Sequence, residues 1–195
     1  MTVRLQQYFH NGVYFITFTC HKWLSLFDIT NGYALVYKWF DVLVENGNHI
    51  IGYVIMPNHI HAIIAFKQHS QSINTRVGNG KRFIAYGLVD ILEQAGNSTV
   101  LHLLESGVNN ADRKRGKKHQ PFIASFDCKE CRSPEFLYQK LNYIHANPCR
   151  GKWSLADVPE NYKHSSANFY STGQIGIYNH ITHFVALNDV DLSKA

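Results

Sequence analysis

Two histidines lie close together near the middle of the sequence, in the segment His59-Ile60-His61. In an extended strand, side chains alternate between faces, so both imidazoles leave the same face while Ile60 points to the other. Two neutral imidazole nitrogens side by side form half of a metal site. The pair proves little by itself, because twelve histidines in 195 residues give about 0.7 such pairs by chance. A metal-dependent reaction needs further residues beside it.

A later helix supplies candidates for these further residues. The run Ser133–Glu135 combines an N-cap side chain, a proline and an acidic residue, which together predict a helix start. Pro148 disfavours helical backbone before it, so the helix should end near Ala146 or Asn147. Tyr143 and Asn147 lie one turn apart on the flank of the apolar stripe, where the amide oxygen can reach a metal held by the histidines. On geometry alone, Tyr143 is also compatible with a half-buried aromatic residue that has a solvated hydroxyl.

Two segments of the sequence together resemble a known family. Tyr53-Val-Ile-Met-Pro-Asn-His-Ile-His-Ala-Ile-Ile64 and Tyr143-Ile-His-Ala-Asn-Pro-Cys-Arg150 are similar to the HUH-type single-tyrosine transposases of the IS200 group, and more closely to their REP-associated branch. The segment 162–170 and the order of elements extend the resemblance over most of the chain. Residues 97–120 have no match in the family pattern.

The resemblance implies both a site and a reaction. His59, His61 and Asn147 take the positions of the family's metal ligands, and Tyr143 takes that of its nucleophile. The implied metal is Mg²⁺ or Mn²⁺, although two imidazoles and an amide oxygen also suit Zn²⁺. The implied reaction is cleavage and transfer of single-stranded, hairpin-forming DNA through a 5′-phosphotyrosine, as in DNA transposition, with no nucleotide cofactor. A homodimer is compatible with the IS200 group, whereas the REP-associated branch need not form one.

The excess positive charge is concentrated in one segment of the chain. Between Ala111 and Lys152 there are ten Lys and Arg residues against four Asp and Glu residues, so this segment carries +6 and the rest of the chain −1. This concentration favours phosphate binding, although a solvated basic loop would have the same composition. The candidate DNA contacts are Lys81, Arg82, Arg113, Lys114, Arg115, Lys117, Lys118, Arg150 and Lys152.

Other functions fit parts of the pattern. A non-catalytic protein that binds DNA or RNA hairpins would use the basic segment and need no ion. A relaxase or replication initiator would use the same histidine pair and differ in the DNA on which it acts. A zinc deaminase is disfavoured, because its His-x-Glu and Pro-Cys-x-x-Cys signatures are incomplete at His61 and Cys149. Cys128 and Cys131 have the spacing of half a structural zinc site, but no second pair follows.

The elements that must position these residues are both strands and helices. The β-rich runs 49–56 and 59–66 flank Pro57-Asn58 and predict a hairpin, and Gly47 and Gly96 are placed to close two helices. The predicted fold class is α+β, a ferredoxin-like antiparallel sheet with helices on one face, as in the resembled family. The predicted strands are 13–20, 49–56, 59–66, 100–104 and 122–126, the predicted helices are 31–46, a segment within 76–95 and 133–147, and 112–120 is a predicted loop.

The chain as a whole is expected to form one domain. It has 195 residues, of which 45% are apolar, and residues from about 150 to 195 are predicted to be a C-terminal extension that packs on the rest. No apolar run approaches the roughly eighteen residues of a membrane span, and the first residues lack the pattern of a secretory signal. We therefore expect a cytoplasmic protein with reduced cysteines and no membrane partner.

Overall fold

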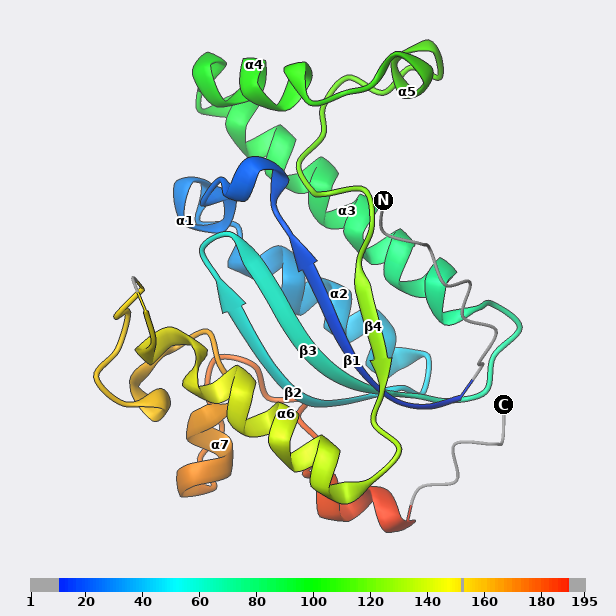
Figure 1. Ribbon diagram of the computed structural model, residues 1–195, viewed down its shortest axis with the longest axis vertical. Coiled ribbons are helices and arrows are strands. Elements are labelled where there is room, and N and C mark those ends of the chain that lie inside the picture. Colours follow the sequence, from blue (N-terminus) through cyan, green and yellow to red (C-terminus); the bar gives the residue numbers. More distant parts are fainter. Residues whose placement is uncertain (1–10, 152, 190–195) are drawn as a thin grey trace.

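The computed structural model describes residues 11–151 and 153–189, and in this part of the chain four strands form one antiparallel sheet (Figure 1). The strands are β1 (Gly12–Thr19), β2 (His49–Met56), β3 (His59–Phe66) and β4 (Asp127–Glu130), in the order β2-β3-β1-β4. Helix α2 (Tyr33–Glu45) joins β1 to β2, and α3 (Ile73–Gln94) lies between β3 and β4. This is the ferredoxin-like succession, and the predicted α+β class is confirmed.

The central strand β3 is buried on both faces of the sheet. Its even-numbered residues belong to a core with α2 and α3, whereas Ile63 and Ala65 pack against α6 (Pro134–Ala146) on the other face. Figure 1 shows α2 and α3 behind the sheet and α6 in front of it. The expectation of helices on one face is therefore right for α2 and α3 and wrong for α6, because the second apolar face of β3 also has to be covered.

The long helix α3 packs closely on α2 through its glycines. A Cβ added at Gly80 would lie 2.1 Å from Nε1 of Trp39, and one at Gly87 would lie 2.5 Å from Cδ2 of Leu35. The helix also begins before residue 76, because the Ser72 side chain accepts a hydrogen bond from the Thr75 amide. These glycines weaken the helical pattern in the sequence and yet are required by the packing.

A stability prediction follows from this close approach. Gly80→Ala should lower the free energy of unfolding by about 1–3 kcal/mol, because the rigid indole of Trp39 must move to admit a methyl group. Gly78→Ala is the matched control in the same helix. Its Cβ would meet nothing within 4 Å, so it should raise the free energy of unfolding by about 0.5–1 kcal/mol. Urea unfolding of both variants measures the difference, and equal midpoints would contradict the packing argument.

Residues 100–104, predicted to be a strand, are helical instead. They lie in α4 (Ser98–Ser106), where the Asn97 side chain caps the start by accepting a hydrogen bond from the Val100 amide. Val100 and Leu104 are both buried, one helical turn apart. The predicted loop 112–120 is also partly helical, because its first residues belong to α5 (Asn110–Lys114). The Asn109 side chain caps this helix by accepting a hydrogen bond from the Asp112 amide.

The predicted strand 122–126 is likewise wrong, since β4 begins only at Asp127. Phe122 forms an isolated bridge with Cys20 at the end of β1. The carbonyls of Ile123 and Ser125 each accept a hydrogen bond of 2.9 Å from Nζ of Lys81. These bonds hold the segment beside α3, and regular pairing with β1 starts only after it.

The segment after Arg150 runs along the free edge of β2. The Ser166 amide donates to the Tyr53 carbonyl (3.0 Å), and the Thr182 amide donates to the Ile50 carbonyl (2.9 Å). These bonds satisfy edge groups that would otherwise be open to pairing with another chain. The segment contains η3 (Pro159–Asn161), α7 (Ala167–Thr172) and η4 (Phe184–Asp189). Two short helices at the other end of the chain, η1 (His21–Trp23) and α1 (Leu26–Thr30), precede α2. No helix in the described residues is long and apolar enough to span a membrane.

Candidate active site

The histidine pair lies at the start of β3, on the face of the sheet that α6 covers. His59 and His61 are each only 6% exposed, and their ring centroids are 4.7 Å apart. Nδ1 of His59 donates to the Asn58 side-chain oxygen (2.6 Å), and Nδ1 of His61 shares a hydrogen bond of 2.7 Å with the Thr17 hydroxyl. Anchoring of one ring nitrogen in this way orients the other as a ligand. The structure therefore brings together the two imidazoles predicted from their spacing.

Burial keeps both imidazoles neutral at physiological pH. It lowers the pKa of His59 to about 4, against a hydrogen bond with the Asn147 side chain that raises it. Burial also lowers the pKa of His61 to about 3, helped by the nearby charges of His59 and Lys140. A neutral imidazole has a free lone pair, so protons compete with a metal for this site only in acid.

Helix α6 places the tyrosine beside this pair. Ser133 caps its start by accepting a hydrogen bond from the Phe136 amide, and the buried Leu141 and Ile144 fix the helix against the sheet. The Tyr143 ring, on the flank of that apolar stripe, is 43% exposed and lies edge-on to His61 with the ring centroids 5.2 Å apart. Tyr143 thus borders both the solvent and the histidines, which suits a nucleophile that must meet a large substrate.

Asn147 completes the group at the end of the same helix. It begins η2 (Asn147–Cys149), close enough to His59 for its side chain to affect that imidazole. This interaction raises the pKa of His59, against the larger lowering by burial. His59, His61 and Asn147 thus lie near one another, and their role as a metal-binding set stays a prediction.

Two residues near the site were missed by sequence reasoning. Nζ of Lys140 lies 5.0 Å from the ring centroid of Phe15 and 5.7 Å from that of Tyr143, one helical turn before the tyrosine. Trp23 is 61% exposed, and its ring centroid is 6.2 Å from that of His59. The i, i+3 spacing of Lys140 and Tyr143 could have indicated the first residue, whereas no sequence pattern points to Trp23.

Trp23 is held in an unusual conformation. Its φ angle is +59°, and that of the preceding Lys22 is +50°, both in the left-handed region that side chains with a Cβ seldom adopt. The Asn58 side-chain amide donates to the Trp23 carbonyl (3.3 Å), and the oxygen of the same side chain accepts from His59. One side chain therefore fixes both the exposed indole and a candidate ligand.

The predicted DNA contacts are distributed over two regions. Arg82, Arg113, Lys114, Arg115 and Lys118 are exposed and Lys117 is half-buried, around α5 and the facing side of α3. Arg150 is exposed just after η2, near Asn147. Lys81 is buried and donates to backbone carbonyls, which favours a structural role over a phosphate contact. Lys152 lies outside the described residues.

Cys128 and Cys131 pack with the cores on opposite faces of the sheet. Cys128 packs with the core on the α3 side of the sheet, and Cys131 packs with the core on the α6 side. Residues 11–151 and 153–189 hold no group of three or more His, Cys, Asp or Glu side chains that could bind a metal.

Two further histidines, the half-buried His145 and the buried His164, make the fold sensitive to acid. Nε2 of His145 hydrogen-bonds to the Ser166 hydroxyl (2.8 Å), and the His164 ring stacks on Tyr33 with the centroids 3.7 Å apart. Burial lowers the pKa of both imidazoles to about 4. Below about pH 6.5 they are therefore protonated in the unfolded chain but stay neutral in the folded chain. The contribution of these two histidines to the free energy of unfolding should be constant above about pH 6.5 and fall by a few kcal/mol between about pH 6.5 and 4. Urea midpoints that are equal at pH 7 and pH 5 would contradict this prediction.

Comparison with known proteins gives the class of fold. No protein-family model matches the sequence, and no curated protein matches it significantly. A solved structure nevertheless shares the described topology, and the chain has the fold of a tyrosine transposase. It is similar over 100% of its length to 98% of a REP-associated tyrosine transposase solved bound to a REP hairpin, with a TM-score of 0.61 and 15% sequence identity. The resemblance seen in the sequence is thus confirmed at the level of the fold.

A second solved structure has a weaker likeness. It is a provisionally assigned transposase of Deinococcus radiodurans R1, with a TM-score of 0.42 and 13% identity over 71% of this chain and 92% of that one.

Proposed function

We propose that this protein is a metal-dependent enzyme that cleaves and rejoins single-stranded DNA through a tyrosine nucleophile, as in DNA transposition. The observation that supports this most is the convergence of four side chains from two elements. His59 and His61 come from β3, and Tyr143 and Asn147 come from α6 and its end, 82 or more residues later in the sequence. A purely structural role for the histidines would not require an exposed tyrosine beside them.

His59, His61 and Asn147 would hold a divalent ion, Mg²⁺ or Mn²⁺ as the resemblance implies, and Zn²⁺ is also compatible with these donors. When bound, such an ion polarises the scissile phosphate and helps to orient it. The protein contributes neutral imidazoles whose second nitrogens are anchored by Asn58 and Thr17. Because these anchors fix the rings before any ligand arrives, little conformational freedom is lost on binding.

Tyr143 would attack the phosphate. A bond forms between its phenolic oxygen and phosphorus, the bond from phosphorus to the 3′ oxygen breaks, and the phenolic proton is transferred, through solvent, to the departing 3′ oxygen. The products are a 5′-phosphotyrosine and a free 3′-hydroxyl. Attack by a 3′-hydroxyl on the phosphotyrosine reverses the step and rejoins DNA. One phosphodiester replaces another, so no nucleotide is consumed.

Lys140 would assist this attack electrostatically. Its ammonium lies near the Tyr143 ring and is held over Phe15, where it favours the negative charge that the phenolic oxygen and the phosphate share during attack. Lys140→Gln should lower the single-turnover cleavage rate about tenfold or more, whereas Lys140→Arg should retain most of it. DNA affinity measured in parallel separates this effect from simple loss of binding, and an unchanged cleavage rate in Lys140→Gln would exclude the role.

The substrate we propose is single-stranded DNA with a hairpin. A REP-associated tyrosine transposase with this fold was solved bound to a REP hairpin. The exposed indole of Trp23 beside His59 is suited to stack an unpaired base next to the scissile phosphate. Arg150 would contact the backbone on the Asn147 side.

A gel assay tests the proposed function. The protein is incubated with labelled hairpin DNA that has single-stranded extensions, in Mn²⁺ or in EDTA, and then denatured. A DNA adduct that survives denaturation should form in Mn²⁺ and be absent in EDTA. Hairpin binding with no adduct under any ion would instead support a non-catalytic hairpin-binding protein.

A further inference from the structure

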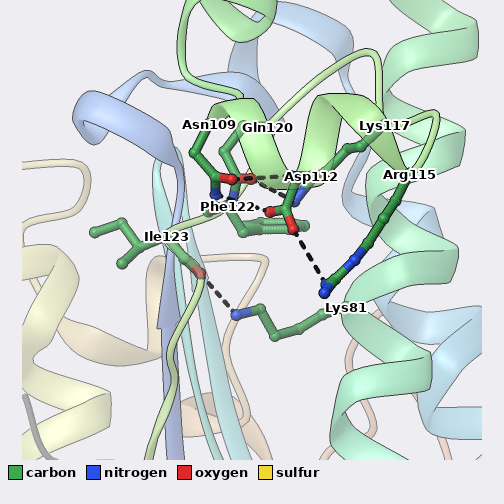
Figure 2. Close-up of polar contacts among 8 residues, drawn as sticks. All are labelled: Lys81, Asn109, Asp112, Arg115, Lys117, Gln120, Phe122 and Ile123. Carbon is green, nitrogen blue, oxygen red and sulfur yellow. Dashed lines mark hydrogen bonds and ion pairs between the residues drawn. The ribbon is translucent and has the colours of Figure 1, made fainter.

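A cleft of about 580 Å³ lies between α3 and residues 115–124, on the α3 side of the sheet and away from the histidine pair. Figure 2 shows its polar groups, with Lys81 below and the α5 segment above. This volume is within the range of roughly 300–1,000 Å³ that small-molecule sites have. Part of its wall belongs to residues 97–120, the segment that does not match the family pattern in the sequence.

The walls of the cleft are held in place by their own polar contacts. Nζ of Lys81 bonds to the carbonyls of Ile123 and Ser125 at 2.9 Å. Lys117 donates to the Gln120 side-chain oxygen, and the Gln120 amide donates to the Phe122 carbonyl. Figure 2 shows the bond of Lys81 to Ile123 and the contacts that link Lys117, Gln120 and Phe122. The site is therefore preformed and does not have to be assembled by a ligand.

The cleft carries an excess of positive charge. Its lining contains five Lys and Arg side chains against two acidic ones, Glu93 and Asp112. Asp112 is shared by Arg115 (3.9 Å) and Lys117 (3.7 Å). Arg82 and Lys118 are exposed and form no ion pair within the described part of the chain. The charge left uncompensated fits a phosphate group.

An aromatic ring stands beside these cations. Tyr86 is 65% exposed and lies one helical turn after Arg82, so both side chains project from the same side of α3 into the lining. Ala85 and Val89 add apolar surface between them. A flat exposed ring next to free cations matches a ligand that has both a base and a phosphate, and a phosphate alone would not use the ring.

We propose that this cleft binds an unpaired nucleotide of the DNA substrate, with its base on Tyr86 and its phosphate between Arg82 and Lys118. The inference rests on the proposed function for the identity of the ligand. The wall of the cleft is bonded to the strand next to the histidines, because the Ile123 amide donates to the Thr19 carbonyl (2.9 Å) and Thr19 pairs with His59. In this proposal, a single strand that crosses the sheet edge near Thr19 would occupy the cleft as well as the candidate active site. The cleft would thus recognise DNA at a distance from the bond that is cut.

Fluorescence anisotropy with labelled oligo-dT tests this proposal, using Tyr143→Phe as the parent protein so that no DNA is cleaved. Tyr86→Ala should weaken binding about tenfold, whereas Tyr86→Phe, which keeps the ring, should bind like the parent. Arg82→Ala combined with Lys118→Ala should reduce the slope of log affinity against log salt by about 1.4. Lys38→Ala, an exposed lysine of α2 outside the cleft, is the charge control and should change neither binding nor slope by a comparable amount.

Equal affinities of Tyr86→Ala and Tyr86→Phe would overturn the proposal, and so would a loss in Lys38→Ala as large as that in the cleft variants. Tighter or equal binding of a blunt duplex would overturn the assignment to an unpaired base. Because Tyr86, Arg82 and Lys118 are exposed, thermal unfolding should show that the variants fold like the parent. The adduct assay with the wild-type protein tests the proposed function separately. If no covalent adduct forms but the cleft variants weaken oligo-dT binding as expected, only the proposed function is refuted.

Discussion

Replacing Tyr143 by phenylalanine should abolish DNA cleavage while leaving DNA binding intact. The substitution removes one oxygen from a ring that is 43% exposed, so the packing of α6 on the sheet is unaffected. Loss of the nucleophile in enzymes that use covalent catalysis costs a factor on the order of 10⁵ or more in rate. Single-turnover cleavage of a labelled hairpin with single-stranded extensions measures this effect directly.

Tyr138→Phe is the matched control for this variant. Tyr138 lies in the same helix and is 56% exposed, but its ring contacts Phe184 and is not among the rings around the histidines. It should cleave like the wild-type protein. Equal rates for Tyr143→Phe and wild type would remove Tyr143 from the nucleophile role, and equal losses in the two variants would mean that the helix had been disturbed.

The second large effect is expected at the histidine pair. His61→Ala should reduce cleavage on the order of a thousandfold, because an ion that stabilises the transition state by several kcal/mol would lose one of its three ligands. His102→Ala replaces an exposed histidine of α4 and should have no such effect. Hairpin affinity measured without metal should be similar in both variants.

The concentration of Mn²⁺ required for cleavage distinguishes a ligand from a merely packed histidine. For His61→Ala this concentration should rise, and added Mn²⁺ should restore part of the rate. A variant that loses activity with an unchanged Mn²⁺ requirement would contradict a role for His61 as a metal ligand.

The fold was predictable where local sequence and burial agree. The hairpin of β2 and β3 and the start of α6 follow from alternation, turn residues and a cap, and the structure places all three as predicted. The helices 98–106 and 110–114 were not predicted. Their starts depend on caps from Asn97 and Asn109, and the short, polar run 110–114 has no apolar period to indicate a helix. The conformation of residues 122–126 is fixed in part by Lys81, which is 42 residues away from Ile123 in the sequence. No local pattern could therefore show that these residues do not form a strand.

The candidate site was predictable in its types of residue and less so in its surroundings. The spacing of His59 and His61 and the turn between Tyr143 and Asn147 are local features, whereas their convergence across the sheet is a property of the whole fold. Trp23 beside His59 depends on a left-handed backbone that the sequence does not indicate. The burial that keeps the imidazoles neutral likewise results from α6 lying on the second face of the sheet.

The most direct test of the account is to locate the covalent bond. Wild-type protein is trapped on hairpin DNA in Mn²⁺, the adduct is digested with protease and nuclease, and the modified peptide is sequenced by mass spectrometry. The account predicts a nucleotide linked through its 5′-phosphate to Tyr143, within the peptide that contains α6. A nucleotide attached to Tyr138 or to any other residue, or cleavage without a covalent intermediate, would contradict it.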